Sequence, residues 1–177
     1  MNADTPRLTI RDLALEDFQA LLAISSDPEV ARTNDYLPGN AEALRSWLEE
    51  TIAAEATQPR VSHHSALLLK PTGELIGWIG FQRNDDPQPG RVDFGYALAR
   101  AFWNQGYMTE AVRAMLEYCF TVLNVEVVQA FHMRDNASSG RVLLKAGMPL
   151  DAEAMRERQD EEVHYRLTAR AWRDQQH

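Results

Sequence analysis

The amino-acid sequence predicts an α/β or α+β domain built around a mixed sheet. Stretches in which apolar residues alternate, as in half-buried strands, are interspersed with stretches in which they recur every three or four positions, as on one helix face. The resulting order is strand, two helices, three strands, helix, strand, helix, strand. At 177 residues, with no internal repeat or low-complexity tract, the chain fits one domain spanning residues 1–177.

The first strand and the first two helices follow from apolar spacing. Leu8 and Ile10 alternate with Thr9 and Arg11, which predicts a strand with one buried face. Apolar residues at helical spacing then mark two helices, with Phe18, Leu21 and Leu22 in one and Leu44, Trp47, Leu48 and Ile52 in the other.

A hairpin is predicted next. Residues 65–70 and 74–83 both read as strands, and Pro71, Thr72 and Gly73 between them are typical turn residues. Residues 84–90 contain two prolines and a glycine and are predicted to form a loop.

The clearest strand covers residues 91–98. Its bulky face, expected in the core, carries Val92, Phe94, Tyr96 and Leu98, and its small face carries Asp93, Gly95 and Ala97. Small side chains let another group approach the backbone closely, and that group is either a ligand or a neighbouring helix.

The second half of the chain continues the alternation. Gly106 leads into a helix with an apolar stripe of Met108, Val112, Met115, Cys119 and Val122. A strand over residues 126–133 is followed by a short helix that Asp135 or Asn136 caps and Gly147 ends. That helix bears Ser139, Val142, Leu143 and Ala146, and a last strand runs over residues 163–167.

Composition narrows the function classes. The net charge of −8 disfavours nucleic acid or an anionic membrane as the main partner and weakly attracts a cationic substrate. No apolar run approaches the ~18 residues of a membrane span. The single cysteine, Cys119, excludes an intramolecular disulfide, and residues 1–7 lack a signal-peptide pattern, so we expect a cytoplasmic protein.

The segment from Phe102 to Ala111 follows a strand and opens a helix. A glycine-bearing loop there presents main-chain N–H groups and the positive end of the helix dipole, which together suit a pyrophosphate. Taken alone, Gly106 also fits a simple turn. The segment has neither the lysine of a nucleotide P-loop nor the three glycines of a dinucleotide-binding fingerprint.

A second segment, Asn136 to Met148, changes this balance. Together the two segments resemble the GNAT superfamily of N-acetyltransferases, the first its pyrophosphate loop and the second its Asn-x-x-Ser helix. Residues 7–12 with Glu16 and Asp17, and residues 163–167 with Trp172, resemble the opening and closing elements of the RimJ/RimL-like branch, which acetylates ribosomal-protein N-termini. The resemblance implies a GNAT-like fold with a mostly antiparallel sheet of six to seven strands flanked by about four helices.

Four positions depart from the superfamily pattern. Trp103, Asn104 and Met148 replace commoner residues, and Met108 replaces a small one. Because Met108 lies on the apolar stripe, we expect its side chain to point into the protein and leave its N–H to the phosphate.

The resemblance also assigns roles. The main-chain N–H groups of Gln105, Gly106, Tyr107, Met108 and Thr109 would hold the pyrophosphate of acetyl-CoA. Residues 93–99 would pair with the pantetheine arm as an added strand does, and an N–H near Leu98 or Ala99 would stabilise the oxyanion. Asn136 and Ser139 would face the thioester, with Ser139 assisting the thiolate because Leu143 stands where many relatives have a tyrosine. Ser139 also fits a plain role in helix-terminal hydrogen bonding.

The general base is predicted to be Asp93, with Glu161 and Glu162 as alternatives. We expect direct attack of the amine in a ternary complex rather than an acetyl-Cys119 intermediate, since a buried cysteine is inert. His63 and His64 lack further converging ligands, so no metal is expected.

The acceptor is predicted to be a primary amine, either a protein N-terminal α-amine or a small molecule. Its specificity is expected to depend on the two early helices with residues 34–39 and on the loop before the last strand. The alternative from another class is a non-catalytic acyl-CoA-binding sensor. The oligomeric state is left open between monomer and homodimer.

Overall fold

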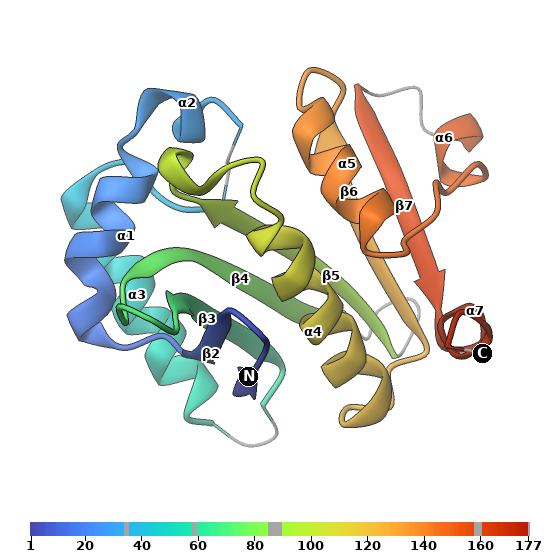
Figure 1. Ribbon diagram of the computed structural model, residues 1–177, viewed down its shortest axis with the longest axis horizontal. Helices are drawn as coiled ribbons and strands as arrows, with labels where there is room; N and C mark the ends of the chain where they lie inside the picture. The colour runs from blue at the N-terminus through green and yellow to red at the C-terminus, as the bar shows by residue number, and fades with distance from the viewer. Residues whose placement is uncertain (34–35, 58–59, 85–89, 158–160, 177) are drawn as a thin grey trace. The chain divides into compact units, whose positions relative to one another are not determined.

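The fold is given by a computed structural model that describes residues 1–33, 36–57, 60–84, 90–157 and 161–176 (Figure 1). The strands are β1 Ala3–Asp4, β2 Leu8–Asp12, β3 Ser62–Leu69, β4 Leu75–Asn84, β5 Arg91–Leu98, β6 Val127–Met133 and β7 Glu162–Thr168. The helices are α1 Phe18–Ser25, α2 Pro28–Ala31, α3 Ala41–Glu55, α4 Tyr107–Thr121, α5 Ala137–Lys145, α6 Ala154–Glu157 and α7 Ala169–Asp174. Two 3₁₀ turns, η1 Leu15–Asp17 and η2 Arg100–Phe102, complete the described elements.

The seven strands form one sheet whose strand order follows the chain. Neighbours are antiparallel from β1 to β4 and between β6 and β7, whereas β5 and β6 are parallel over Arg91–Asp93. In the described ranges, α1, α3, α4 and α5 have eight residues or more and the other α-helices are shorter. The predicted fold class is confirmed, including the strand number, the mostly antiparallel sheet and the four longer helices.

The chain divides into two compact units. The first comprises Met1–Gln82 and Gly95–Tyr107, and the second comprises Arg83–Phe94 and Met108–His177. The boundaries fall inside β4, inside β5 and at the start of α4. The single domain over residues 1–177 therefore stays a prediction, and each unit is described by itself.

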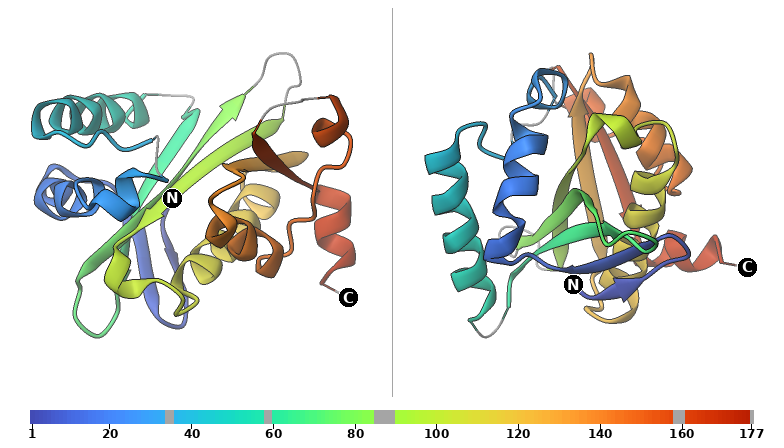
Figure 2. Two further views of the ribbon diagram at one scale, coloured as in Figure 1. Left: turned by 90° about the horizontal axis from the view of Figure 1, so that it is seen from above. Right: turned by 60° about the vertical axis from the view of Figure 1, so that its left-hand side comes forward.

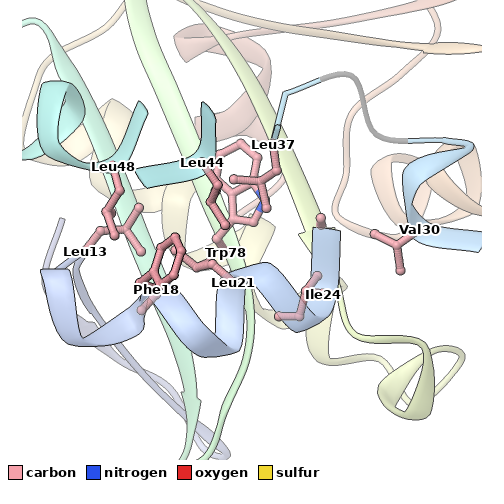
Figure 3. Close-up of a cluster of buried hydrophobic side chains, with 11 residues drawn as sticks. Leu13, Phe18, Leu21, Ile24, Val30, Leu37, Leu44, Leu48 and Trp78 are labelled. Atoms are coloured by element: carbon pink, nitrogen blue, oxygen red, sulfur yellow. The ribbon is translucent and has the colours of Figure 1, made fainter. Parts of the chain in front are cut away.

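In the first unit, α1 and α3 lie side by side on the same side of β3 and β4 (Figure 2). Their apolar faces meet the indole of Trp78, which is 1% exposed, in a core that Figure 3 shows from the helix side. The core comprises Leu13, Phe18, Leu21, Ile24, Val30, Leu37, Leu44, Leu48, Ala66, Trp78 and Ala97. Both early helices were predicted from these apolar positions, and the core explains their spacing.

The small face of β5 is occupied by protein in this unit. A Cβ added to Gly95 would lie 2.7 Å from the ring of Tyr36, and Ala97 belongs to the core. The sequence left open whether a ligand or a neighbouring helix approaches this face. At Gly95 and Ala97 protein side chains do so, and the one at Gly95 comes from a loop and not from a helix. On β4, Gly77 allows a similarly close approach, since its Cβ would lie 2.5 Å from the carbonyl oxygen of Ala97.

In the second unit, α4 buries the predicted stripe. Met108, Val112, Met115 and Cys119 are at most 4% exposed. Val122 is a correction, because α4 ends at Thr121 and the Val122 side chain is 58% exposed. The helical period continued in the sequence for one residue after the helix had ended.

Strands β6 and β7 and helices α5, α6 and α7 follow α4 in the second unit (Figure 1). On β6, Val128, Ala130 and His132 are buried, while Phe131 and Met133 on the opposite face are 42% and 39% exposed. The predicted cap is confirmed, since the side chain of Asn136 accepts a hydrogen bond from the Ser139 N–H at 3.2 Å. Gly147 follows α5 with a φ of 96°, a conformation that favours glycine.

Several predicted boundaries move. The loop predicted over residues 84–90 starts one residue later than predicted, because Asn84 still belongs to β4. Residues 85–89 of this loop lie outside the described residues. Residues 34 and 35 of the predicted specificity segment also lie outside them. In the described parts of the chain, no helix combines the length and apolar character needed to cross a bilayer.

Candidate active site

The loop before α4 is shaped by two residues with positive φ. Asn104 has φ 59° and Gly106 has φ 82°, so the backbone turns twice within three residues. Side chains fasten the turn: the Trp103 indole N–H donates to the Leu98 carbonyl at 2.7 Å, and the Gln105 amide donates to the Ala101 carbonyl at 2.9 Å. Trp103, one of the departures from the superfamily pattern, therefore holds the loop to the end of β5.

The first turn of α4 offers a row of main-chain donors. Within the described residues, the N–H groups of Gln105 to Thr109 donate to no carbonyl or side chain of the protein. The side chain of Met108 is 4% exposed, so it points inward as predicted. These N–H groups, with the positive end of the helix dipole, make a fitting receptor for a diphosphate.

Arg7 is a residue at this loop that the sequence did not mark as part of the site. Its Nη1 donates to the Gln105 carbonyl at 2.9 Å, and its guanidinium lies 4.3 Å from the ring centre of Tyr107. Both partners belong to the same unit as Arg7. The two ends of this contact are 98 residues apart, so only the folded chain shows it.

The two oxyanion donors predicted at the end of β5, the N–H groups of Leu98 and Ala99, differ in their surroundings. The Ala99 N–H donates to the Ile76 carbonyl at 2.8 Å, so this donor is already used inside the protein. The hydrogen bond between Trp103 and Leu98 uses the Leu98 carbonyl oxygen and not the Leu98 N–H. The Leu98 N–H is therefore the candidate oxyanion donor that we retain.

Helix α5 places Asn136 and Ser139 together in the second unit. Ser139 is half-buried, one residue before the buried Gly140. Leu143 is fully buried and apolar, so the place where many relatives have a tyrosine carries no polar group here. Ser139, one helical turn before Leu143, is the hydroxyl on that face of α5.

Beneath α5 lies a buried polar pair. A Cβ on Gly140 would lie 2.6 Å from His132 Nε2 and 2.7 Å from the Tyr165 hydroxyl oxygen. His132 Nδ1 lies 2.8 Å from the Met133 carbonyl, which can only accept, so Nδ1 carries the proton. In that tautomer Nε2 accepts from the Tyr165 hydroxyl at 3.1 Å. Burial raises the pKa of Tyr165 above its ordinary value, which keeps the phenol protonated.

The candidate general bases are partly accessible carboxylates in the second unit. The Asp93 side chain is 43% exposed, and Arg91 Nη2 lies 3.2 Å from its Oδ1. Glu162 on β7 pairs with His164 Nε2 at 3.3 Å, and Glu161 is exposed next to it. Asp93 and Glu162 stand on strands that flank β6.

The possible nucleophile Cys119 and the possible metal ligands His63 and His64 lie elsewhere in the fold. The Cys119 thiol is fully buried, and burial raises its pKa to about 12. His63 is buried, while His64 Nδ1 lies 2.9 Å from Glu55 Oε1. Throughout residues 1–33, 36–57, 60–84, 90–157 and 161–176, no three histidine, cysteine or acidic side chains gather as metal ligands.

Residues 7–149 match the family described as acetyltransferase (GNAT) domain. A Bacillus licheniformis protein named uncharacterized N-acetyltransferase p20 is 32% identical over 139 residues, which cover 78% of this chain and 77% of that protein.

Two solved structures share the fold. The ribosomal-protein-S5-alanine acetyltransferase of Vibrio fischeri is similar with a TM-score of 0.79 and 13% identity, over 97% of this chain and 98% of that one. An aminoglycoside acetyltransferase, AAC(6')-Ib, in complex with coenzyme A is similar with a TM-score of 0.78 and 19% identity, over 96% of this chain and 99% of that one.

Proposed function

Because the chain belongs to the GNAT acetyltransferase family, we propose that it transfers an acetyl group from acetyl-CoA to a primary amine. One observation carries the choice of donor: consecutive main-chain N–H groups from Gln105 to Thr109 lie at the start of α4 with no acceptor among the described residues. A diphosphate accepts hydrogen bonds from such a row without any side-chain contact.

Gly106 supports this fit to a diphosphate. Its φ of 82° is one that residues with a side chain rarely adopt, and Gly106 is exposed. The pantetheine arm would then run along β5, whose parallel ladder with β6 covers only Arg91–Asp93. In this arrangement the Leu98 N–H donates to the developing oxyanion.

The reaction is a direct attack of the amine on the thioester carbonyl. Asp93 accepts the proton that the amine loses, and the Ser139 hydroxyl donates a hydrogen bond to the leaving thiolate. Cys119 takes no part, since a fully buried thiol with a pKa of about 12 is not ionised near neutral pH.

An α-amine fits this site better than a lysine side chain. An α-amine with a pKa of ~8 is about 10% neutral at pH 7, whereas a lysine with a pKa of ~10.4 is about 0.04% neutral. Asp93 is partly accessible and paired with Arg91, so nothing in its surroundings specialises it for a strongly basic amine. The Vibrio fischeri enzyme, by its name, acts on a ribosomal protein, which supports a protein N-terminus as one acceptor to test.

The direct test measures thiol release from acetyl-CoA over a panel of peptides with free N-termini and of small amines. We expect release that depends on the amine and is largest with an α-amine. If coenzyme A binds tightly but no amine on the panel causes release, the chain is an acyl-CoA sensor instead.

Ser139→Ala tests the leaving-group role. Because the hydrogen bond that caps α5 comes from the Ser139 main-chain N–H, the substitution leaves the cap in place. We expect kcat to fall by about 100-fold, with the KM for acetyl-CoA changed less than about threefold. Ser138→Ala, one residue earlier on an exposed position, is the matched control and keeps its kcat. An unchanged kcat in Ser139→Ala would remove the residue from the mechanism.

A further inference from the structure

We propose that Arg7 is a positioning residue of the coenzyme site, which orients the Gln105–Gly106 peptide so that its N–H faces the diphosphate. This inference rests on the proposed function and extends the site to the opposite end of the sequence. All residues involved belong to the first unit.

The main chain at Arg7 is itself fixed. Its carbonyl accepts a hydrogen bond from the Lys70 N–H at 3.0 Å, just past the end of β3. From this anchor the side chain reaches the loop, where Nη1 donates to the Gln105 carbonyl at 2.9 Å. The loop is thereby tied to the strands of its own unit by a charge-assisted hydrogen bond.

The ring of Tyr107 holds the guanidinium from another direction. The Arg7 Cζ lies 4.3 Å from the ring centre, within the range of a cation–π contact. The Tyr107 ring in turn meets Phe102 edge-on at 6.1 Å between centroids. Two contacts with different geometry leave the Arg7 guanidinium little freedom relative to the loop.

The planarity of the peptide gives this contact its consequence. In a trans peptide the carbonyl of one residue and the N–H of the next point in opposite directions. By binding the Gln105 carbonyl, Arg7 turns the Gly106 N–H away from itself, and this N–H has no acceptor among the described residues of the protein.

Gly106 makes this orientation depend on an outside contact. A glycine populates positive and negative φ about equally, so the peptide before it has no strong preference of its own. A Cβ at this position would lie 3.4 Å from Arg7 Nη2, which shows how closely the guanidinium packs on the turn. The contact with Arg7 therefore fixes the orientation of the Gln105–Gly106 peptide, which Gly106 alone would leave free.

The test compares coenzyme A affinity of the wild-type chain and Arg7→Met by calorimetry at low salt and at about 1 M salt, where the Debye length is about 3 Å. We expect affinity to fall between about 10- and 100-fold, as for the loss of one hydrogen bond to a charged group. Since Arg7 acts through the loop, the loss persists at high salt. A loss that disappears at high salt would show a direct charge contact and overturn the positioning role.

Arg100→Met is the matched control. It removes the same charge from the same unit, but the Arg100 guanidinium pairs with Asp27 at 3.5 Å. We expect its affinity for coenzyme A to stay within about twofold of wild type. An equal loss in both variants would reduce the Arg7 effect to general electrostatics.

Two further arms sharpen the assignment. The loss in Arg7→Met is the same with dephospho-coenzyme A, and a loss that vanishes with this ligand would assign Arg7 to the 3′-phosphate instead. Tyr107→Leu and Arg7→Met combine non-additively, since both break the same arrangement. If the wild-type chain binds no coenzyme A, the proposed function fails together with this inference; if it binds and Arg7→Met binds equally, only the inference fails.

Discussion

At the scale of single residues, Gly140 shows how a missing methyl group lets polar side chains pack under a helix. His132 and Tyr165 are 8% and 3% exposed and hydrogen-bond to each other directly below it. Each satisfies the other, so neither hydroxyl nor imidazole loses free energy to an unmade bond. The first turn of α5, which carries Ser139, rests on this pair.

Gly140→Ala is therefore expected to destabilise the protein. In an ordinary exposed helix the change to alanine gains up to about 1 kcal/mol. Here the added Cβ would lie 2.6 Å from His132 Nε2 and 2.7 Å from the Tyr165 hydroxyl oxygen, and both side chains are buried. We expect a net loss of about 1 to 3 kcal/mol in the free energy of unfolding, measured in urea.

Gly39→Ala is the control for this prediction. Its Cβ would meet nothing closer than 3.7 Å, and its φ is not positive. We expect its free energy of unfolding to stay the same or rise slightly. A Gly140→Ala variant as stable as Gly39→Ala would contradict the packing seen beneath α5.

Residue identity predicted local chemistry better than long-range contacts. Asn136 is readable as a cap because a side-chain acceptor before a helix needs only the next three residues. Arg7 at Gln105 and Tyr36 at Gly95 are not readable, since both contacts join segments far apart in the chain. The use of the Ala99 N–H by Ile76 was hidden for the same reason.

At the scale of elements, length decided what the sequence predicted. The long strands and helices each contain several repeats of their apolar period, and every one of them was predicted. The elements that were not predicted, β1, α2, α6, α7 and the 3₁₀ turns η1 and η2, have between two and six residues. Less than two helical turns does not define a period, so tertiary contacts decide such segments.

Two asparagine caps allow an element-scale prediction that separates stability from function. Asn40 accepts from the Ala43 N–H at 2.8 Å at the start of α3, and Asn136 accepts from the Ser139 N–H at 3.2 Å at the start of α5. Replacing either by alanine removes one cap, so we expect each variant to lose about 1 kcal/mol in the free energy of unfolding.

Of the two variants, only Asn136→Ala is expected to lose activity in addition to stability. Asn136→Ala loosens the turn that carries Ser139, so kcat falls, whereas Asn40→Ala keeps the wild-type kcat at a temperature where both are folded. Urea unfolding and steady-state kinetics on the same samples check both parts. Equal kcat values in the two variants would separate the α5 cap from the reaction.

At the scale of the whole molecule, charge and burial make stability depend on pH. Arg60 binds the Asp12 carboxylate with two hydrogen bonds at 2.8 and 2.9 Å, and it also contacts Glu55. The hydrogen bonds from Arg60 outweigh the effect of burial and lower the pKa of Asp12 to about 2. Next to this cluster lies His63, 5% exposed, whose ring stacks on Phe81 at 4.7 Å between centroids. Burial first, and then the nearby positive charges of Arg60 and the N-terminal ammonium, lower the pKa of His63 to about 4.

The sign of the effect follows from which state binds the proton first. Between pH 6.5 and 4 the unfolded chain takes up a proton at His63 that the folded protein refuses, so the free energy of unfolding falls as the pH is lowered. Below the ordinary pKa of 3.8, the unfolded chain also protonates Asp12 before the folded protein does, and stability falls further toward pH 2.

Urea unfolding at several pH values between 7 and 3 should show both limbs. His63→Gln should flatten the limb above pH 4, and Asp12→Asn the limb below it. A wild-type free energy of unfolding that stays constant from pH 7 to 4.5 would contradict the buried, neutral imidazole on which this argument depends.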